Sequence, residues 1–215
     1  MIPDFSKWGF WDWTGNSVYV MLAADALWGL YCAAIIQLRL GQLAFKTSAQ
    51  QDAFMENLEP ALRKGDVNLA TQLCSGDRRA LPQLLGLAIR NFGLGLDKLV
   101  ELIADRFQRD VMEDLEGRVS WVNNVIKTAP MLGLLGTVLG MMGAFGKLSG
   151  GNSVKAQDLA NDIAVALITT AIGLAIAIPA TIFIANVNLK LKRLDGMMSE
   201  GLNRFFDSIG ALVRK

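Results

Sequence analysis

Four polar side chains that could handle ions lie inside apolar stretches of the sequence. Asp25 lies in "SVYVMLAADALWGLYCAAIIQL", whereas Thr137, Thr169 and Thr170 lie in two later stretches. Hydroxyl and carboxylate oxygens suit protons and hard cations such as sodium. An ionised carboxylate near the bilayer midplane costs about 2.5–3.5 kcal/mol, so Asp25 is expected to face protein or water. These four residues are therefore the candidates for an ion pathway.

Each candidate also has a structural interpretation. A threonine hydroxyl in a membrane helix commonly bonds the carbonyl four residues earlier in its own helix. Asp25 could equally be a hydrogen-bonding group between helices, in either protonation state. Asp162 is expected near the start of the last apolar helix, where the helix dipole favours a carboxylate, and capping is favoured there.

Small residues accompany the threonines. The stretch "TAPMLGLLGTVLGMMGAFGKL" places four glycines at spacings of three, four and three, which puts them on one helical stripe: Gly133, Gly136, Gly140 and Gly143. Such a stripe lets another backbone approach closely. Pro130 precedes it, and Pro179 interrupts the next apolar stretch. Helices that tolerate proline, glycine and threonine at membrane depth are shielded from lipid by neighbouring helices.

Composition excludes several classes of protein. The chain has 215 residues, of which 52% are apolar, and a formal net charge of +1. The apolar residues are clustered, which favours a membrane protein, and no basic run suggests nucleic acid. The absence of histidine removes His-based metal sites and His-dependent catalytic triads. Cys32 and Cys74 lie in an apolar and a polar segment and are not expected to form a disulfide. We find no catalytic or cofactor motif and expect neither an enzyme nor a cofactor.

The predicted fold is all-α, with three transmembrane helices at 16–38, 125–148 and 159–187. Basic residues flank these spans on one side, so the positive-inside rule puts the N-terminus outside and the C-terminus inside. Residues 1–15 would then be a periplasmic interfacial segment, rich in tryptophan and phenylalanine, that precedes an uncleaved anchor. Residues 149–158 would be a periplasmic loop and 188–215 a cytoplasmic C-terminal helix.

Residues 39–124 are predicted to form a helical cytoplasmic domain. Glycine beside aspartate at Gly65 and at Gly76 indicates turns that end one helix and cap the next. Apolar residues at helical spacing from Leu96 to Phe107 indicate a last helix that runs directly into the second span.

The pair of motifs "APMLGLLGTVLGMMGAF" and "ALITTAIGLAIAIPA" resembles the MotA/TolQ/ExbB family of inner-membrane ion-channel proteins, in its ExbB/TolQ-like branch. The resemblance covers roughly residues 128–190. It implies a homopentameric ring around two copies of a single-span partner, similar to ExbD, TolR or MotB, that carries a membrane aspartate. It further implies a bacterial inner-membrane stator in which the motive force of protons, or of sodium, drives the partner and energises envelope or transport work. By position, Thr137 and Thr170 match pore-facing threonines, and Pro130 and Pro179 match prolines of the second and third spans.

One position departs from the family pattern. Relatives of ExbB and TolQ usually carry a glutamate shortly before the threonine of the third span, whereas this sequence has Val165. The charge on the pathway would then come from the partner's aspartate or from Asp25, and the choice between proton and sodium stays open. The alternative function is a structural membrane scaffold without ion conduction, which would explain the glycines but not the aligned threonines.

Overall fold

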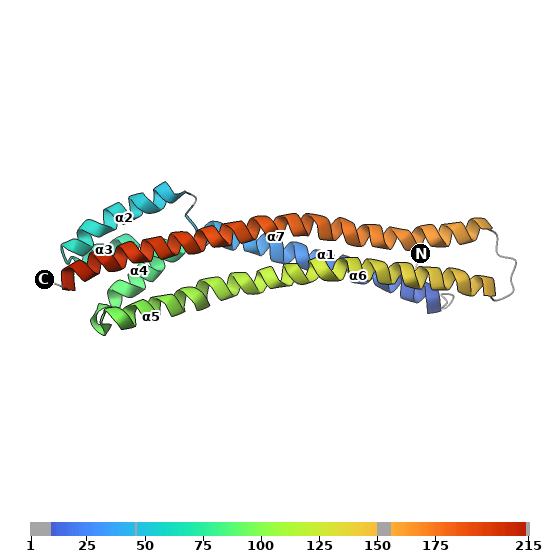
Figure 1. Cartoon of the computed structure of the whole chain (residues 1–215), viewed down its shortest axis with the longest axis horizontal. Helices are drawn as coiled ribbons and strands as arrows, with labels where there is room; N and C mark the ends of the chain where they lie inside the picture. Colours follow the sequence, from blue (N-terminus) through green and yellow to red (C-terminus); the bar gives the residue numbers. More distant parts are fainter. Residues whose placement is uncertain (1–9, 46, 150–155, 214–215) are drawn as a thin grey trace. The chain divides into compact units, whose positions relative to one another are not determined.

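The computed structural model describes residues 10–45, 47–149 and 156–213. Parts of the predicted N-terminal segment 1–15 and of the loop 149–158 lie outside these ranges. The described residues are mostly helical and contain no strand (Figure 1). The elements are α1 (Phe10–Leu43), α2 (Ser48–Arg63), α3 (Val67–Cys74), α4 (Ala80–Arg90), the 3-10 turn η2 (Phe92–Leu94), α5 (Leu96–Phe107), the π-helical segment η3 (Gln108–Met112), α6 (Glu113–Ser149) and α7 (Ala156–Val213).

Within the described residues, three helices are long and apolar enough to cross a membrane, and they include most of α1, α6 and α7. Large apolar side chains on them point outward, for example Leu27, Leu134 and Ile182, each at least 60% exposed. Apolar surface of this kind is stable against lipid but not against water. The prediction of an all-α integral membrane protein with three spans is therefore confirmed.

The chain divides into two units, the described parts of 1–33 with 119–185, and of 34–118 with 186–215. The first unit contains the segments of α1, α6 and α7 that carry the candidate site. The second contains α2 to α5 and the ends of the three long helices. Both thiols are free, Cys32 in the first unit and Cys74 in the second, as expected.

In the second unit two glycine turns connect α2, α3 and α4. Gly65 and Gly76 have φ of 71° and 87°, in the left-handed region that favours glycine. The Asp66 carboxylate accepts a hydrogen bond at 3.0 Å from the backbone N–H of Leu69 and so caps α3. The two predicted turns are confirmed, and a third left-handed glycine, Gly95, begins α5 without having been predicted.

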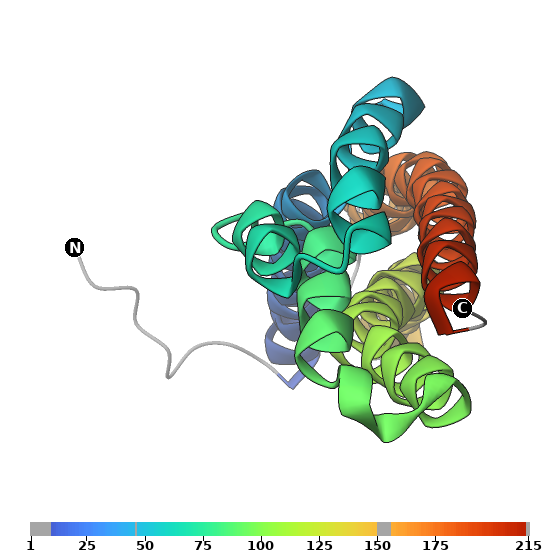
Figure 2. The same ribbon diagram turned by 90° about the vertical axis from the view of Figure 1, so that its left-hand side faces the viewer.

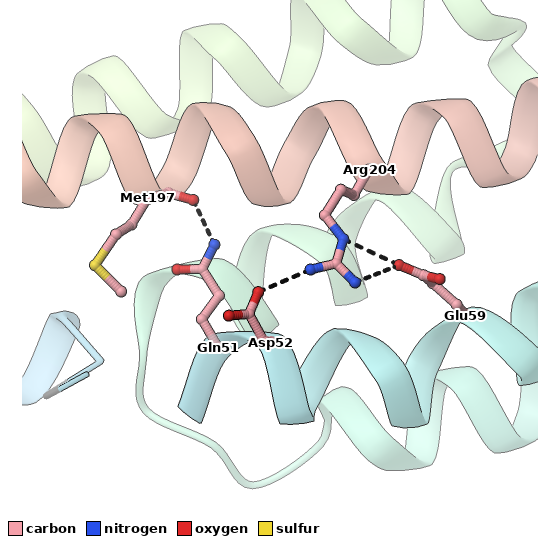
Figure 3. Close-up of polar contacts among 5 residues, drawn as sticks. All are labelled: Gln51, Asp52, Glu59, Met197 and Arg204. Carbon is pink, nitrogen blue, oxygen red and sulfur yellow. Dashed lines mark hydrogen bonds and ion pairs between the residues drawn. The ribbon is translucent and has the colours of Figure 1, made fainter. Parts of the chain in front are cut away.

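Helices α2 and α4 lie beside the C-terminal part of α7 (Figure 2). Arg204 of α7 donates to Glu59 through Nε at 3.1 Å and through a terminal nitrogen at 2.8 Å, and it reaches Asp52 at 2.9 Å (Figure 3). The pKa of this guanidinium is raised, and the hydrogen bond to Glu59 is the largest cause. Gln51 donates to the Met197 carbonyl at 2.6 Å. The guanidinium of Arg204 and the side-chain amide of Gln51 thus hold α2 against α7.

Cys74 ends α3 and is buried. Burial, and then the negative charge of Asp77, raise the pKa of its thiol to about 11. The thiol is therefore protonated at neutral pH and acts as a packing group.

Helix α5 continues through η3 into α6, as predicted for the approach to the second span. A row of buried side chains runs along this continuous helix, spaced four residues apart except for one spacing of eight that passes Phe107. The row consists of Leu99, Ile103, Val111 and Leu115. A step of four advances about 400° in an α-helix, so such a row drifts by about 40° at every step. The π turn contains one extra residue for the same rotation, so it cancels this angular drift and keeps the buried row on one face of the helix.

Candidate ion-pathway site

Close contact between α6 and α7 forms the centre of the site. A Cβ added at Gly136 would lie 2.5 Å from Thr169 Oγ1, and one at Gly140 would lie 2.6 Å from the Cβ of Ala166. Only glycine allows helices to approach this closely. We call this contact, formed by Gly133, Gly136 and Gly140 of α6 with Ala166, Thr169 and Thr170 of α7, the α6–α7 seam.

At two points, Gly133 of α6 and Gly173 of α7, the backbones of the two helices approach each other directly. A Cβ at Gly133 would lie 2.8 Å from the carbonyl oxygen of Thr169. A Cβ at Gly173 would overlap the carbonyl oxygen of Ala129 and come within 3.3 Å of the Cα of Pro130. Gly173 was not among the predicted packing residues, because the residues that it contacts, Ala129 and Pro130, lie on the other helix. Gly143, the last residue of the predicted stripe, is partly buried.

Two threonine hydroxyls of α7 converge on one carbonyl of α6. Thr169 Oγ1 and Thr170 Oγ1 each lie 3.0 Å from the carbonyl oxygen of Gly133, and Thr169 Oγ1 also lies 2.6 Å from the Ala166 carbonyl. Thr169 is 3% exposed and Thr170 is partly buried. Because hydroxyls of α7 donate to α6, they join the two helices as well as bonding within their own helix.

Thr137 is buried, and its hydroxyl donates at 2.7 Å to the carbonyl of Leu134, three residues earlier. This contact is the local backbone bond that threonine commonly makes in a helix. A threonine that donates its only proton to a carbonyl keeps its oxygen lone pairs free to accept. Thr137, Thr169 and Thr170 thus offer oxygen ligands to a cation or to a hydrated proton that reaches them.

Asp25 on α1 is partly buried and has a polar neighbour on the second span. Thr128 Oγ1 donates at 2.8 Å to the Asp25 carboxylate. The pair lies in an open groove between α1 and α6, and at its edge the rings of Trp28 and Trp121 meet edge to face at 5.8 Å. Asp25 lines this groove and the three candidate threonines do not, so the structure does not bring them together with Asp25. Nothing in the sequence spacing pointed to Thr128.

Position 165 lies next to α1. Tyr19 donates its hydroxyl to the carbonyl oxygen of Val165 at 3.2 Å. The Val165 side chain itself is 53% exposed. The backbone at the position where the family resemblance leads us to expect a glutamate therefore accepts a hydrogen bond from a phenol group of the first span.

Asp162 forms an ion pair with Lys147, with 2.7 Å between the Asp162 carboxylate and Nζ. Helix α7 begins at Ala156, so Asp162 lies in the second turn, beyond the first-turn positions that cap a helix. The expectation that Asp162 caps the third helix is wrong, because the helix starts earlier than the apolar run does.

Pro179 lies beside a pocket of about 350 Å³ formed by α1, α6 and α7. Having no N–H, Pro179 leaves the carbonyl of Ala175, four residues earlier, without its helical donor. Gly29 of α1 and Val125 of α6 line the same pocket, and a Cβ at Gly29 would lie 3.0 Å from Val125. The first span thus also packs through a glycine, which the sequence analysis had not included.

Comparisons with known proteins find one family and several similar sequences. The model of the MotA/TolQ/ExbB proton channel family matches residues 94–200. The chain is 43% identical over 104 residues to a Tol-Pal system protein TolQ of Haemophilus influenzae, an alignment that covers 48% of this chain and 44% of that protein. It is 37% identical over 103 residues to a biopolymer transport protein ExbB of Xanthomonas campestris, covering 46% and 40%. A putative ExbB-like protein of Synechocystis is 40% identical over 84 residues, covering 37% and 33%. The chain thus spans less than half the length of each of these relatives.

Proposed function

The chain belongs to the MotA/TolQ/ExbB proton channel family, and on this premise we propose that it is the ring-forming subunit of an ion-driven stator. Five copies surround the membrane helices of two copies of a single-span partner, similar to ExbD, TolR or MotB, in the bacterial inner membrane. Protons, or sodium ions, pass between the ring and the partner's aspartate. The movement that results drives the partner and energises envelope or transport work. The family consists of channel proteins, and we propose no enzyme activity.

The α6–α7 seam is the observation that carries this proposal. Hydroxyls of Thr169 and Thr170 converge on the Gly133 carbonyl, and Thr137 lies one turn further along α6. Their oxygens can replace part of the hydration shell of a cation, and the glycines hold them in a fixed arrangement. A scaffold would need the glycines alone.

The outward face of α6 supports a pathway along this helix. Ser120, Asn124 and Lys127 of α6 are exposed. At the same level of the first unit, α1 and α7 expose Leu30 and Ile178 instead. Lys127 lies within the predicted second span, 125–148, whereas Ser120 and Asn124 precede it. A charged side chain at membrane depth faces protein or water rather than lipid. We therefore orient the ring with this face of α6 toward a water-filled interior and with the apolar faces of α1 and α7 outward.

Ion flux in vesicles tests the proposal. The chain is reconstituted with and without a coexpressed single-span partner, and proton and sodium uptake are followed with ion-sensitive dyes. We expect flux with the partner, and we expect the double change Thr137→Val, Thr170→Val to lower it by at least tenfold while leaving assembly intact, because valine keeps the shape but removes the hydroxyl.

Thr181→Val is the matched control for the double change. Thr181 is exposed on the same helix, and its hydroxyl donates at 2.8 Å to the Ala177 carbonyl of its own helix. Its loss should leave flux unchanged. Equal flux in the wild-type chain and in the Thr137, Thr170 double variant would reject the pathway, and no flux with any partner would favour the scaffold.

A further inference from the structure

A second pocket lies outside the candidate site, in the second unit. It has a volume of about 240 Å³ and lies between the last turns of α1 and the part of α7 that follows the apolar run. Its apolar wall contains Leu40, Phe45 and Leu194, all less than 10% exposed, together with Met197. The Phe45 ring also contacts Phe54 and lies 4.4 Å from the guanidinium carbon of Arg79. The parts of these four side chains that line the pocket offer apolar surface to a ligand.

Two cations lie at the edge of this apolar wall. Lys190 and Arg193 line the pocket, and they are three residues apart on α7 and therefore on one face of the helix. Lys190 Nζ donates to Gln37 Oε1 at 3.1 Å, which fixes the ammonium at the pocket rim. Across the described part of the chain, neither cation forms an ion pair with a carboxylate. The positive charge at this pocket is therefore not neutralised by the chain itself.

The pocket lies where the third span meets water. The apolar run of α7 ends just before Lys190, and the next turn carries Lys192 and Arg193. Lys and Arg at this level of a membrane protein meet lipid phosphates, and each is worth about a fivefold change in binding to an anionic surface. A ligand that fits must join a phosphate to an apolar chain.

We propose that this pocket binds one anionic phospholipid. The lipid phosphate lies between Lys190 and Arg193, with Gln37 holding the ammonium in place. The upper part of one acyl chain lies against Leu40, Phe45 and Leu194. The proposal concerns the second unit only and does not depend on ion conduction.

Native mass spectrometry of the purified full chain in a mild detergent tests the proposal. Dioleoyl phosphatidylglycerol or dioleoyl phosphatidylcholine is added, and the bound lipid is counted. We expect phosphatidylglycerol to bind and the double change Lys190→Gln, Arg193→Gln to weaken its binding by at least tenfold. Lys192→Gln removes one charge at the same level but does not line the pocket, so binding should change by less than twofold.

Filling the pocket gives an independent test that leaves both cations in place. Gly41 lines the pocket, and a Cβ added there meets no atom within 4 Å. Gly41→Leu should therefore be accommodated in the open space and should also prevent phosphatidylglycerol from binding. Helicity and the thermal midpoint, measured by circular dichroism, check that the variants fold.

Three results would overturn the proposal. Equal loss of lipid in Lys192→Gln and in the double variant would mean that only the general surface charge attracts lipid. Unchanged lipid binding in Gly41→Leu would mean that the lipid does not bind in this pocket. Competition by millimolar inorganic phosphate, with no difference between the two lipids, would identify a site for free anions.

Discussion

At the scale of single residues, a carboxylate inside a membrane span must find a partner. Asp25 accepts a hydrogen bond from Thr128, whose backbone is only three residues beyond the α6 residue that packs on Gly29. The sequence predicted that Asp25 faces protein or water, because an unpaired charge is unfavourable in hydrocarbon. The sequence could not name Thr128, since the two residues are 103 positions apart and no periodicity links them.

Asp25→Asn tests whether this carboxylate packs or handles ions. We expect it to pack, so asparagine, which keeps the shape and still accepts a hydrogen bond from Thr128, should change flux by less than twofold. Asp25→Ala and Thr128→Val each remove the hydrogen bond and should destabilise the chain by about 1 kcal/mol. The thermal midpoint in detergent and vesicle flux are the two measurements.

A different pattern would assign Asp25 to the ion pathway. In that case Asp25→Asn would lower flux as strongly as Asp25→Ala, and the dependence of flux on pH or sodium would shift.

At the scale of helices, the α6–α7 seam depends on the volume of side chains at a few positions. Gly140 faces the methyl group of Ala166, and Gly136 faces Thr169. In a membrane the hydrophobic effect does not drive helices together, so close packing and interhelical hydrogen bonds must do so. A methyl group at the wrong position therefore weakens the seam more than it would weaken a soluble helix pair.

Exchanging glycine and alanine between positions 140 and 166 tests this contact. Gly140→Ala should lower the thermal midpoint in detergent, because its new Cβ would lie 2.6 Å from that of Ala166. Adding Ala166→Gly removes the second methyl group and should restore most of the loss. Gly140→Leu should disturb assembly as well.

Gly146→Leu is the control on the same helix, since a Cβ added at Gly146 meets no atom within 4 Å. A Gly140→Leu variant with unchanged assembly and midpoint would argue against a role for the seam.

The helices themselves were largely predictable, and their contacts less so. Apolar runs and glycine–aspartate pairs carry strong local signals, and the three long helices and the turns at Gly65 and Gly76 followed from them. The start of α7 was placed too late because its first turns are polar and continue the helix beyond the apolar run. Gly173, Gly29 and Thr128 were missed because their importance comes from residues on other helices, and no local pattern reports such contacts.

At the scale of the whole molecule, a closed ring of several copies would explain both the α6–α7 seam and the polar face of α6. Lys127 of α6 is exposed and needs water, while α1 and α7 expose mainly apolar residues. A single chain in a bilayer cannot keep water against one face only, whereas a closed ring can enclose it. Cyclic symmetry also keeps each copy at the same depth in the membrane.

Native mass spectrometry or mass photometry of the chain in a mild detergent measures the number of copies. We expect a pentamer, and five copies of 23.3 kDa give about 117 kDa without detergent. Lys127→Ala, at an exposed position of α6, should leave the mass unchanged if its face lines the interior. A stable monomer at micromolar concentration would contradict the ring.

The π-helical segment Gln108–Met112 has a consequence for insertions and deletions. A π turn holds one residue more than an α turn, so the segment is equivalent to a one-residue insertion in a continuous α-helix. Deleting Asp110, an acidic residue that does not belong to the buried row, would close the turn into a regular α-helix and leave Leu99 and Ile103 on the same face as Leu115. Alignments with relatives that lack the π turn should therefore show a single-residue gap here, even though the flanking helices match without gaps.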